Sequence, residues 1–389
     1  MTTRPFYLYT GLHAFLIGLF PFYLPVYFYS SGMGISRICL FIAATGAGYC
    51  ITLYIFDRLR SRLAPTWLIN FSFVSEFILL AIVLWQGSRI EVIPTGLTNG
   101  VFACLFWTVQ RLLFVSSVHS GNSGNHFGNA QLLVMISMKV AILLGGLLLD
   151  QNREAAVLLC SGALIVLAVA VFVRYPITTA IKEEFTSADP LSLRRVIHFS
   201  DSLYSRPVFI VDGVLLYLES YFWLISVFLV FHQDFSKLGL VTVILALLFG
   251  GIYLVIKKTI DRYADQPLYE LAVVLYLLSW LLRAYIDEID NPAAMMTLLA
   301  VIVFCTSLFR LSFNKRFFDN AKLSTACHHI VVKSYISQFF LSIFFLLAAV
   351  LIDQPFDKEQ QLTPLYFTAA LLTPVFFLYR KKRVGSSLK

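Results

Sequence analysis

Residues 130–149 read AQLLVMISMKVAILLGGLLL, and these twenty positions contain a single charged side chain, Lys139. A helix of about 20 mostly apolar residues is long enough to cross the hydrocarbon core of a bilayer. Charged residues return directly after the stretch, at Asp150 and Arg153. The stretch therefore predicts a transmembrane helix that ends at Leu149.

The same pattern recurs along the whole chain of 389 residues. The composition is 59% hydrophobic and 13% charged, with a mean hydropathy of +0.79, whereas a soluble domain has about 25% charged residues. Because a helix satisfies its own backbone hydrogen bonds in lipid, we predict an all-α polytopic membrane protein with twelve transmembrane helices. The predicted spans cover approximately 6–29, 36–56, 66–86, 92–116, 130–149, 155–173, 207–231, 238–256, 268–286, 293–313, 331–352 and 362–379.

A longer polar stretch interrupts this series after the sixth span. It predicts an N-terminal six-helix bundle at 1–173, a central cytoplasmic loop at 174–206, a C-terminal six-helix bundle at 207–379 and a basic cytoplasmic tail at 380–389. The two bundles are expected to be pseudo-symmetric.

Lysine and arginine are distributed unevenly between alternate loops. With a cytoplasmic N terminus, 21 of the 30 Lys and Arg residues lie in inner loops and tails, and five lie in outer loops. Because basic residues accumulate on the cytoplasmic side, we expect both termini to be cytoplasmic and the protein to reside in the plasma (inner) membrane. The net charge of +8 thus indicates orientation, and we expect no nucleic-acid partner.

An Asp-Arg pair follows the second span of each half. Residues 56–62 read FDRLRSR and residues 260–265 read IDRYAD, so the two pairs are 204 positions apart. Duplicated halves are common in transporters, whose solute sites lie between the halves near the middle of the membrane. The repeat therefore favours a solute carrier.

Two sets of six spans with a doubled Asp-Arg loop resemble the major facilitator superfamily, whose loop pattern is Gly-x-Leu-Ala-Asp-Arg-x-Gly-Arg-Lys/Arg. In the first copy Leu53 and Arg60 replace the two glycines. The resemblance implies a twelve-helix secondary active transporter, a symporter or antiporter, that works by alternating access. It also implies a cytoplasmic gating loop formed by the matching residues Asp57, Arg58, Arg62, Asp261 and Arg262.

Several ionisable side chains fall inside the predicted spans. Each costs roughly 2.5–3.5 kcal/mol to insert and usually faces the bundle interior or a wet cavity. In the resembled family the first, fourth, seventh and tenth helices line the central cavity. The candidate substrate-binding and coupling residues are His13, Trp107, Gln110, Arg111, Lys139, Asp212, Glu219, Trp223 and Arg310.

Helical spacing suggests how these residues work together. Asp212 and Glu219 are seven positions apart and share one helix face, and we expect them to pair with Arg111 and Lys139 of the first half when the cavity is empty. Because a poorly solvated site favours the neutral form of a carboxyl group, we expect Glu219 to carry a coupled proton. The indoles of Trp107 and Trp223 are expected to stack on an organic solute.

Structural roles are the alternative for some of these charges. Lys139 has a possible structural partner in Glu76, and Asp212 lies only one and a half turns into its span. Arg283 and Lys333 lie near span ends, where long basic side chains reach the interface, so we expect them to be anchors.

The acidic loop near residue 289 offers an alternative function. Asp287, Glu288 and Asp290 are suited to a cation and a diphosphate, as in an intramembrane lipid- or isoprenoid-modifying enzyme, but the charge count places them outside, in a short loop. Among transporters, Arg111 and Lys139 favour an organic anion, and drug or siderophore efflux or uptake stay open. We expect a non-enzymatic monomer in lipid with a small-molecule substrate and a proton as partners, and with no cofactor and no metal.

Overall fold

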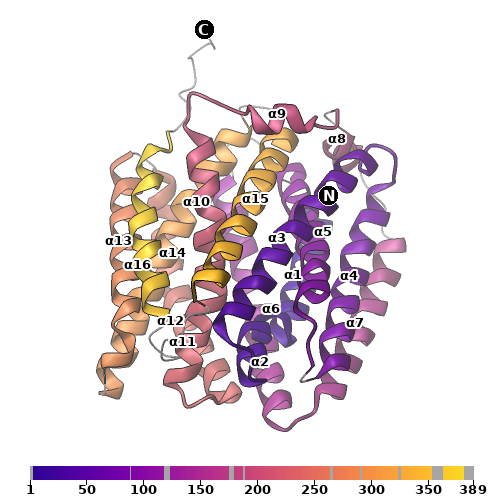
Figure 1. The fold of residues 1–389 in the computed structure, drawn as a ribbon. Helices are drawn as coiled ribbons and strands as arrows, with labels where there is room; N and C mark the ends of the chain where they lie inside the picture. The colour runs from indigo at the N-terminus through magenta and orange to yellow at the C-terminus, as the bar shows by residue number, and fades with distance from the viewer. Residues whose placement is uncertain are drawn as a thin grey trace.

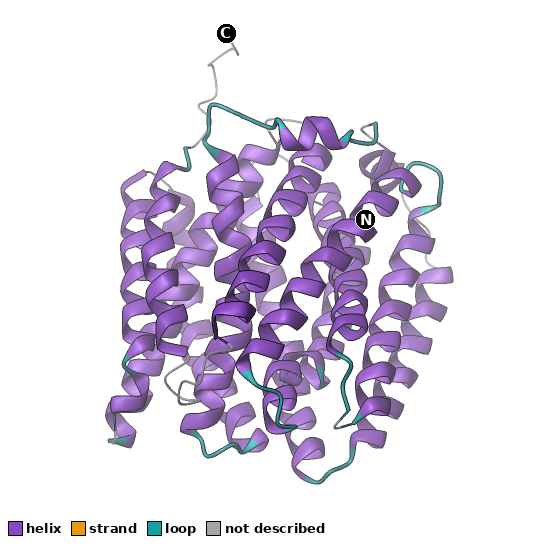
Figure 2. Cartoon of the chain, in the orientation of Figure 1, coloured by secondary structure: helices purple, strands orange, loops and turns teal. Residues whose placement is uncertain are grey.

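Apolar segments in lipid are expected to be helical, and the computed structural model shows helices throughout. It describes residues 3–87, 89–117, 123–174, 179–186, 189–262, 266–289, 291–322, 326–352 and 362–380. Figure 2 shows helices joined by loops, and no residue within these ranges forms a strand.

The first half of the chain begins with a bent span. Pro21 has no backbone N–H and cannot continue the preceding helix, so the chain turns by 47° between the segments on either side of Phe20. The helices of this half are α1 (Thr3–Leu19), η1 (Pro21–Tyr23), α2 (Leu24–Ser30), α3 (Ile35–Leu59), α4 (Pro65–Gln86), α5 (Val92–Ser117), α6 (Ser123–Asp150) and α7 (Glu154–Arg174).

The predicted central loop contains two short helices, α8 (Thr179–Thr186) and α9 (Leu193–Ile197). Ile181 and Phe185 of α8 are buried, and α8 packs against α4 and α5. This part of the predicted loop is therefore an amphipathic helix seated on the first half.

The first span of the second half is irregular. It is interrupted by a π-helical turn, and such single turns are frequent at functional sites. The elements are α10 (Ser205–Tyr217), the π-turn η2 (Leu218–Phe222), α11 (Trp223–Val230), α12 (Phe235–Arg262), α13 (Gln266–Ala284), η3 (Ile286–Glu288), α14 (Pro292–Lys322), α15 (Ala326–Ile352), α16 (Leu362–Leu372) and η4 (Thr373–Leu378).

Each of the twelve predicted segments is helical. Nine described spans are long and apolar enough to cross a bilayer, and the bent first span makes a tenth. Two shorter apolar helices, Phe235–Leu247 and Leu362–Leu378, stand where the eighth and twelfth spans are expected. The chain is thus an integral multi-pass membrane protein.

Figure 1 shows the helices of the first half on one side of the bundle and those of the second half on the other, with α8 and α9 across one end. The most extensive packing between the halves joins α3 with α15 and α6 with α12. Glycines permit the close approach in both pairs. A Cβ at Gly46 would lie 2.6 Å from the carbonyl oxygen of Gln338, and one at Gly146 would lie 2.9 Å from that of Phe235.

One span is much longer than its apolar run predicts. Helix α14 has 31 residues and continues to Lys322, nine residues beyond the predicted end at 313. Arg316, in this extension, is buried with its guanidinium 3.7 Å from the centre of the Tyr269 ring. The predicted end at 313 would place Arg310 within one turn of the end of the span, whereas three further helical turns follow it in the structure.

Candidate functional site

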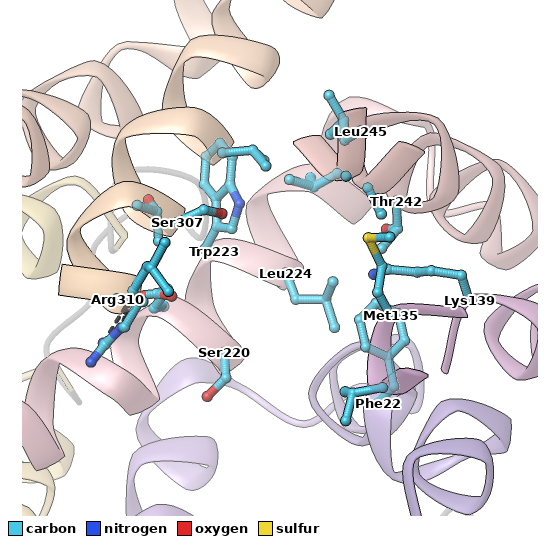
Figure 3. A pocket seen from close by; sticks show the side chains of 18 of the residues that line it. Phe22, Met135, Lys139, Ser220, Trp223, Leu224, Thr242, Leu245, Ser307 and Arg310 are labelled. Carbon is cyan, nitrogen blue, oxygen red and sulfur yellow. Dashed lines mark hydrogen bonds and ion pairs between the residues drawn. The ribbon is translucent and has the colours of Figure 1, made fainter. Parts of the chain in front are cut away.

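A cavity of about 440 Å³ lies between helices of both halves. Figure 3 places Arg310, Trp223 and Ser307 on one side and Lys139, Met135 and Thr242 on the other. Leu224 and Ser220 lie between the two sides. Because the cavity is mostly apolar with a few polar and charged groups, it has the character of a small-molecule site.

Arg310 of α14 is the centre of a charge network beside this cavity. Its Nη1 donates to Oδ1 of Asp212 at 2.7 Å, and its Nη2 and Nε donate to Oε2 of Glu219 at 2.9 and 3.1 Å. The two carboxylates thus lie on one helix face, as their seven-residue spacing predicts, and a single guanidinium binds both.

Lys333 of α15 completes the network from the other side of Asp212. Its Nζ lies 2.7 Å from Oδ2 of Asp212, and both side chains are buried. The expectation that Lys333 is an interfacial anchor is wrong, because α15 begins at Ala326 and places Lys333 two turns inside the helix.

The carboxylate of Glu219 projects from the π-turn η2. Besides Arg310, Tyr276 of α13 donates its hydroxyl to Oε2 of Glu219 at 2.9 Å. Tyr276 also lies 3.2 Å from Nη2 of Arg310. Nothing in the sequence distinguishes Tyr276 from the other eighteen tyrosines, so only the fold identifies it.

The predicted pairing of charges across the two halves is not observed. Asp212 and Glu219 bind Arg310 and Lys333, which all belong to the second half. Arg111 does reach across the interface, where its Nη1 donates to Oγ of Ser334 at 3.1 Å, but that partner is neutral. Within the described residues, Arg111 has no carboxylate partner.

Lys139 lines the cavity from α6. Its Nζ lies 5.8 Å from the centre of the Phe22 ring, and no carboxylate of the described residues forms an ion pair with it. The alternative pairing of Lys139 with Glu76 is wrong, because Glu76 binds His13.

His13 does not line this cavity. Its Nδ1 lies 2.7 Å from Oε2 of Glu76 and its Nε2 lies 2.9 Å from Oγ of Ser72, with the imidazole stacked 3.9 Å from the Phe73 ring. All of these side chains are fully buried within the first half. The expected solute-binding position of His13 is therefore wrong, because Glu76 and Ser72 of α4 hold the imidazole in the helix core.

The two tryptophans behave differently. Trp223 lines the cavity, as expected. Trp107 is 41% exposed and lies 5.9 Å from the guanidinium carbon of Arg111, outside the cavity lining, as does Gln110. The α5 residues Trp107, Gln110 and Arg111 therefore form a separate group from the residues around Arg310.

Arg283 of α13 is the second expected anchor that the structure relocates. It is 1% exposed and lines the cavity. Its position nine residues before Pro292 made it look interfacial. In the structure, however, its guanidinium lies against the rings of Trp223 and Trp280, one residue before the end of α13.

The first Asp-Arg loop is locked to the central linker. Oδ2 of Asp57 accepts the backbone N–H of Leu191 at 2.7 Å, and Oδ1 accepts Nε of Arg60 at 2.8 Å. Arg60 also donates to the carbonyl of Phe185 at 2.6 Å. Burial raises the pKa of the nearby Glu184 carboxyl, although Arg60 opposes the effect.

The other predicted gating residues have different positions. Arg58 stacks on the Tyr54 ring at 3.3 Å, and Arg62 is exposed. The side chains of Asp261 and Arg262 lie outside the described part of the structure. Asp57 therefore uses Arg60, the residue that departs from the family pattern, and not Arg58.

The described residues contain no group of three or more His, Cys, Asp or Glu side chains placed to hold a metal ion. Of the acidic loop that suggested an enzyme, Glu288 is exposed, and Asp290 and the side chain of Asp287 lie outside the described residues.

Comparison with known proteins rests on structure alone. No protein-family model matches the chain, and no curated protein matches its sequence. A single-residue variant of the nucleoside transporter NupG matches with a TM-score of 0.70 and 14% identity, covering 97% of this chain and 98% of that one. The unsubstituted NupG structure gives a TM-score of 0.65 at 13% identity, with the same coverage.

A D-xylose-proton symporter matches with a TM-score of 0.71 and 10% identity, covering 96% of each chain. With nearly the whole chain superposed in each comparison, this protein has the same fold as these two transporters.

Proposed function

We propose that this protein is a secondary active transporter that moves a small organic anion across the membrane by alternating access, with a proton as the coupling ion. The observation that carries the proposal is the charged cavity of about 440 Å³ between the two halves of a major facilitator fold. In such transporters the halves rock about a central site. The glycine contacts of α3 with α15 and of α6 with α12 lie where that motion would act.

The balance of charge favours an anion. Two carboxylates, Asp212 and Glu219, are accompanied by Arg310 and Lys333, which bind them. Lys139 and Arg283 add two further cations to the cavity wall without carboxylate partners among the described residues. Because unpaired charges are costly away from water, an anionic solute would stabilise this arrangement.

The network also offers a route for coupling to protons. Protonation of Glu219 would remove its charge and weaken its hold on Arg310, so proton binding and the position of Arg310 would be linked. A related coupling is named for one structural neighbour, which is a D-xylose-proton symporter. In the proposal the protein is a monomer of the plasma (inner) membrane with both termini cytoplasmic.

Reconstitution into proteoliposomes tests this proposal. The probes are labelled 3-phenylpropionate, succinate, uridine and D-xylose, each offered with an inward proton gradient and with the gradient collapsed by a protonophore. We expect gradient-dependent accumulation of an organic acid. Accumulation of uridine or D-xylose alone would contradict the anion assignment, and the absence of flux for every probe, with folded protein in the vesicles, would contradict the carrier.

A further inference from the structure

The guanidinium of Arg283 is buried beside the cavity and forms no ion pair with a carboxylate of the described residues. Its Nη1 donates to Oγ of Ser279 at 2.9 Å and its Nη2 donates to Oγ1 of Thr306 at 2.7 Å. Both acceptors are neutral hydroxyls, and the buried Nε has no hydrogen-bond partner. Three of the five N–H donors of this guanidinium are thus unused.

Two indole rings fix the position of this charge. The guanidinium carbon lies 4.3 Å from the centre of the Trp280 ring and 5.0 Å from that of Trp223. Trp280 is fully buried, whereas Trp223 forms part of the cavity wall. Aromatic faces attract a cation, but they leave its N–H donors unsatisfied, and buried donors normally have acceptors.

The neighbouring carboxylate is already engaged. Glu219 lines the same cavity, but its Oε2 accepts Arg310 and Tyr276. Among the described residues, Arg283 is therefore the guanidinium on this wall that has no carboxylate partner and keeps several N–H donors for a solute. A single unpaired guanidinium matches a singly charged, planar carboxylate, which can accept two parallel N–H bonds.

We propose that Arg283 forms a carboxylate-binding subsite and that the solute is an amphipathic organic acid whose apolar body lies against Trp223, Leu224 and Val227. These three side chains line the cavity next to the subsite. That the bound acid is also transported rests on the function proposed above; the binding subsite itself does not.

Binding of a matched pair of probes tests the subsite. 3-Phenylpropionate and its neutral amide, 3-phenylpropionamide, have nearly the same shape and differ in charge. Titrated into purified protein in detergent, the acid is expected to change the tryptophan fluorescence saturably and to raise the unfolding temperature. We expect the amide to bind roughly ten- to a hundredfold more weakly, because it lacks the charged acceptor.

Variants separate recognition from folding. Arg283→Gln is expected to abolish the preference for the acid over the amide, and Arg283→Lys is expected to keep part of it. Arg316→Gln is the matched control, because Arg316 is also buried against an aromatic ring but does not line the cavity. Trp223→Phe is expected to remove most of the fluorescence response while the thermal shift persists.

Equal binding of acid and amide, unchanged preference in Arg283→Gln, or no saturable response to the acid at millimolar concentration in folded wild-type protein would each overturn the subsite. Phenyl phosphate binding more tightly than 3-phenylpropionate would overturn the choice of carboxylate. If only the carrier proposal fails, the acid binds through Arg283 without flux. If only the subsite fails, an organic acid is transported with an unchanged KM in Arg283→Gln.

Discussion

Arg60 donates from Nε to Oδ1 of Asp57 at 2.8 Å, and neither side chain is exposed. This pair stands where the resembled family has an Asp followed three positions later by a glycine. The linker segment before α9 is bound by both members of the pair, since Asp57 accepts from Leu191 and Arg60 donates to Phe185. The substitution of glycine by arginine thus ties the linker to the first half.

Arg60→Gly, which restores the family's residue, should be strongly destabilising. It leaves Asp57 buried without its cation, a loss of about 3–5 kcal/mol for a broken buried pair. Thermal unfolding in detergent measures the effect. Arg58→Gly is the control, since Arg58 is partly exposed and, among the described residues, contacts the carbonyl and ring of Tyr54 and no carboxylate. Equal losses in the two variants would refute the linker lock.

Lys333→Met should also lower the unfolding temperature, because it leaves one oxygen of Asp212 without its partner. We expect the free energy of unfolding to fall by about 3 kcal/mol. The loss should be smaller in the double variant Asp212→Asn with Lys333→Met, because Asp212 is then no longer a carboxylate that lacks its lysine. Lys139→Met is the control, because it removes another lysine from inside the helix bundle. Because Lys139 has no carboxylate partner among the described residues, we expect little loss of stability or a gain, and a loss as large as that of Lys333→Met would be the contrary result.

Glu219→Gln should uncouple transport from the proton gradient. The amide keeps the shape of the side chain. It cannot bind and release a proton, and it lacks the negative charge that pairs with Arg310. In proteoliposomes we expect gradient-driven accumulation to fall roughly tenfold or more, while exchange of labelled for unlabelled solute persists. Glu288→Gln, which removes an exposed acid, is the control. Full gradient-driven accumulation by Glu219→Gln would exclude this carboxylate from coupling.

Gly46→Ala should disturb the contact between α3 and α15. Its new Cβ would lie 2.6 Å from the Gln338 carbonyl oxygen and 2.8 Å from Cδ2 of Leu341. Alanine stabilises a helix by about 0.5–1 kcal/mol relative to glycine. Overpacking costs about 1–3 kcal/mol, so we expect a net loss of stability. Gly34→Ala meets no atom within 4 Å and should be tolerated. Unfolding temperatures of the two variants check this, and an unchanged value for Gly46→Ala would contradict it.

The fold was predictable from the sequence because each span must be apolar and must satisfy its own backbone hydrogen bonds in lipid. Every apolar run of sufficient length became helical, and even the break at Pro21 follows from one residue's chemistry. The length of α14 was not predictable, because its polar last turns are held by tertiary contacts such as that of Arg316 with Tyr269.

The site was only partly predictable, for a related reason. Asp212, Glu219 and Arg310 were recognisable as charges inside spans, and their helical spacing gave a shared face. Which cation binds which acid depends on how helices far apart in sequence are juxtaposed, so Lys333 was missed and His13 was misplaced. A charge near the end of an apolar run is ambiguous until the neighbouring helix is known, as Arg283 illustrates.

The π-turn at Leu218–Phe222 has a consequence for how the α10–α11 span presents its side chains. A π-turn holds one residue more than an α-helical turn would, and each residue in an α-helix advances the direction of its side chain by about 100°. Deleting Ser220 would therefore swing everything from Trp223 onward away from Asp212 by that angle. Glu219, inside the turn, and the indole of Trp223, directly after it, both line the cavity. The extra residue of the turn, and not the chemistry of any one side chain, therefore sets the rotation between Asp212 and that indole.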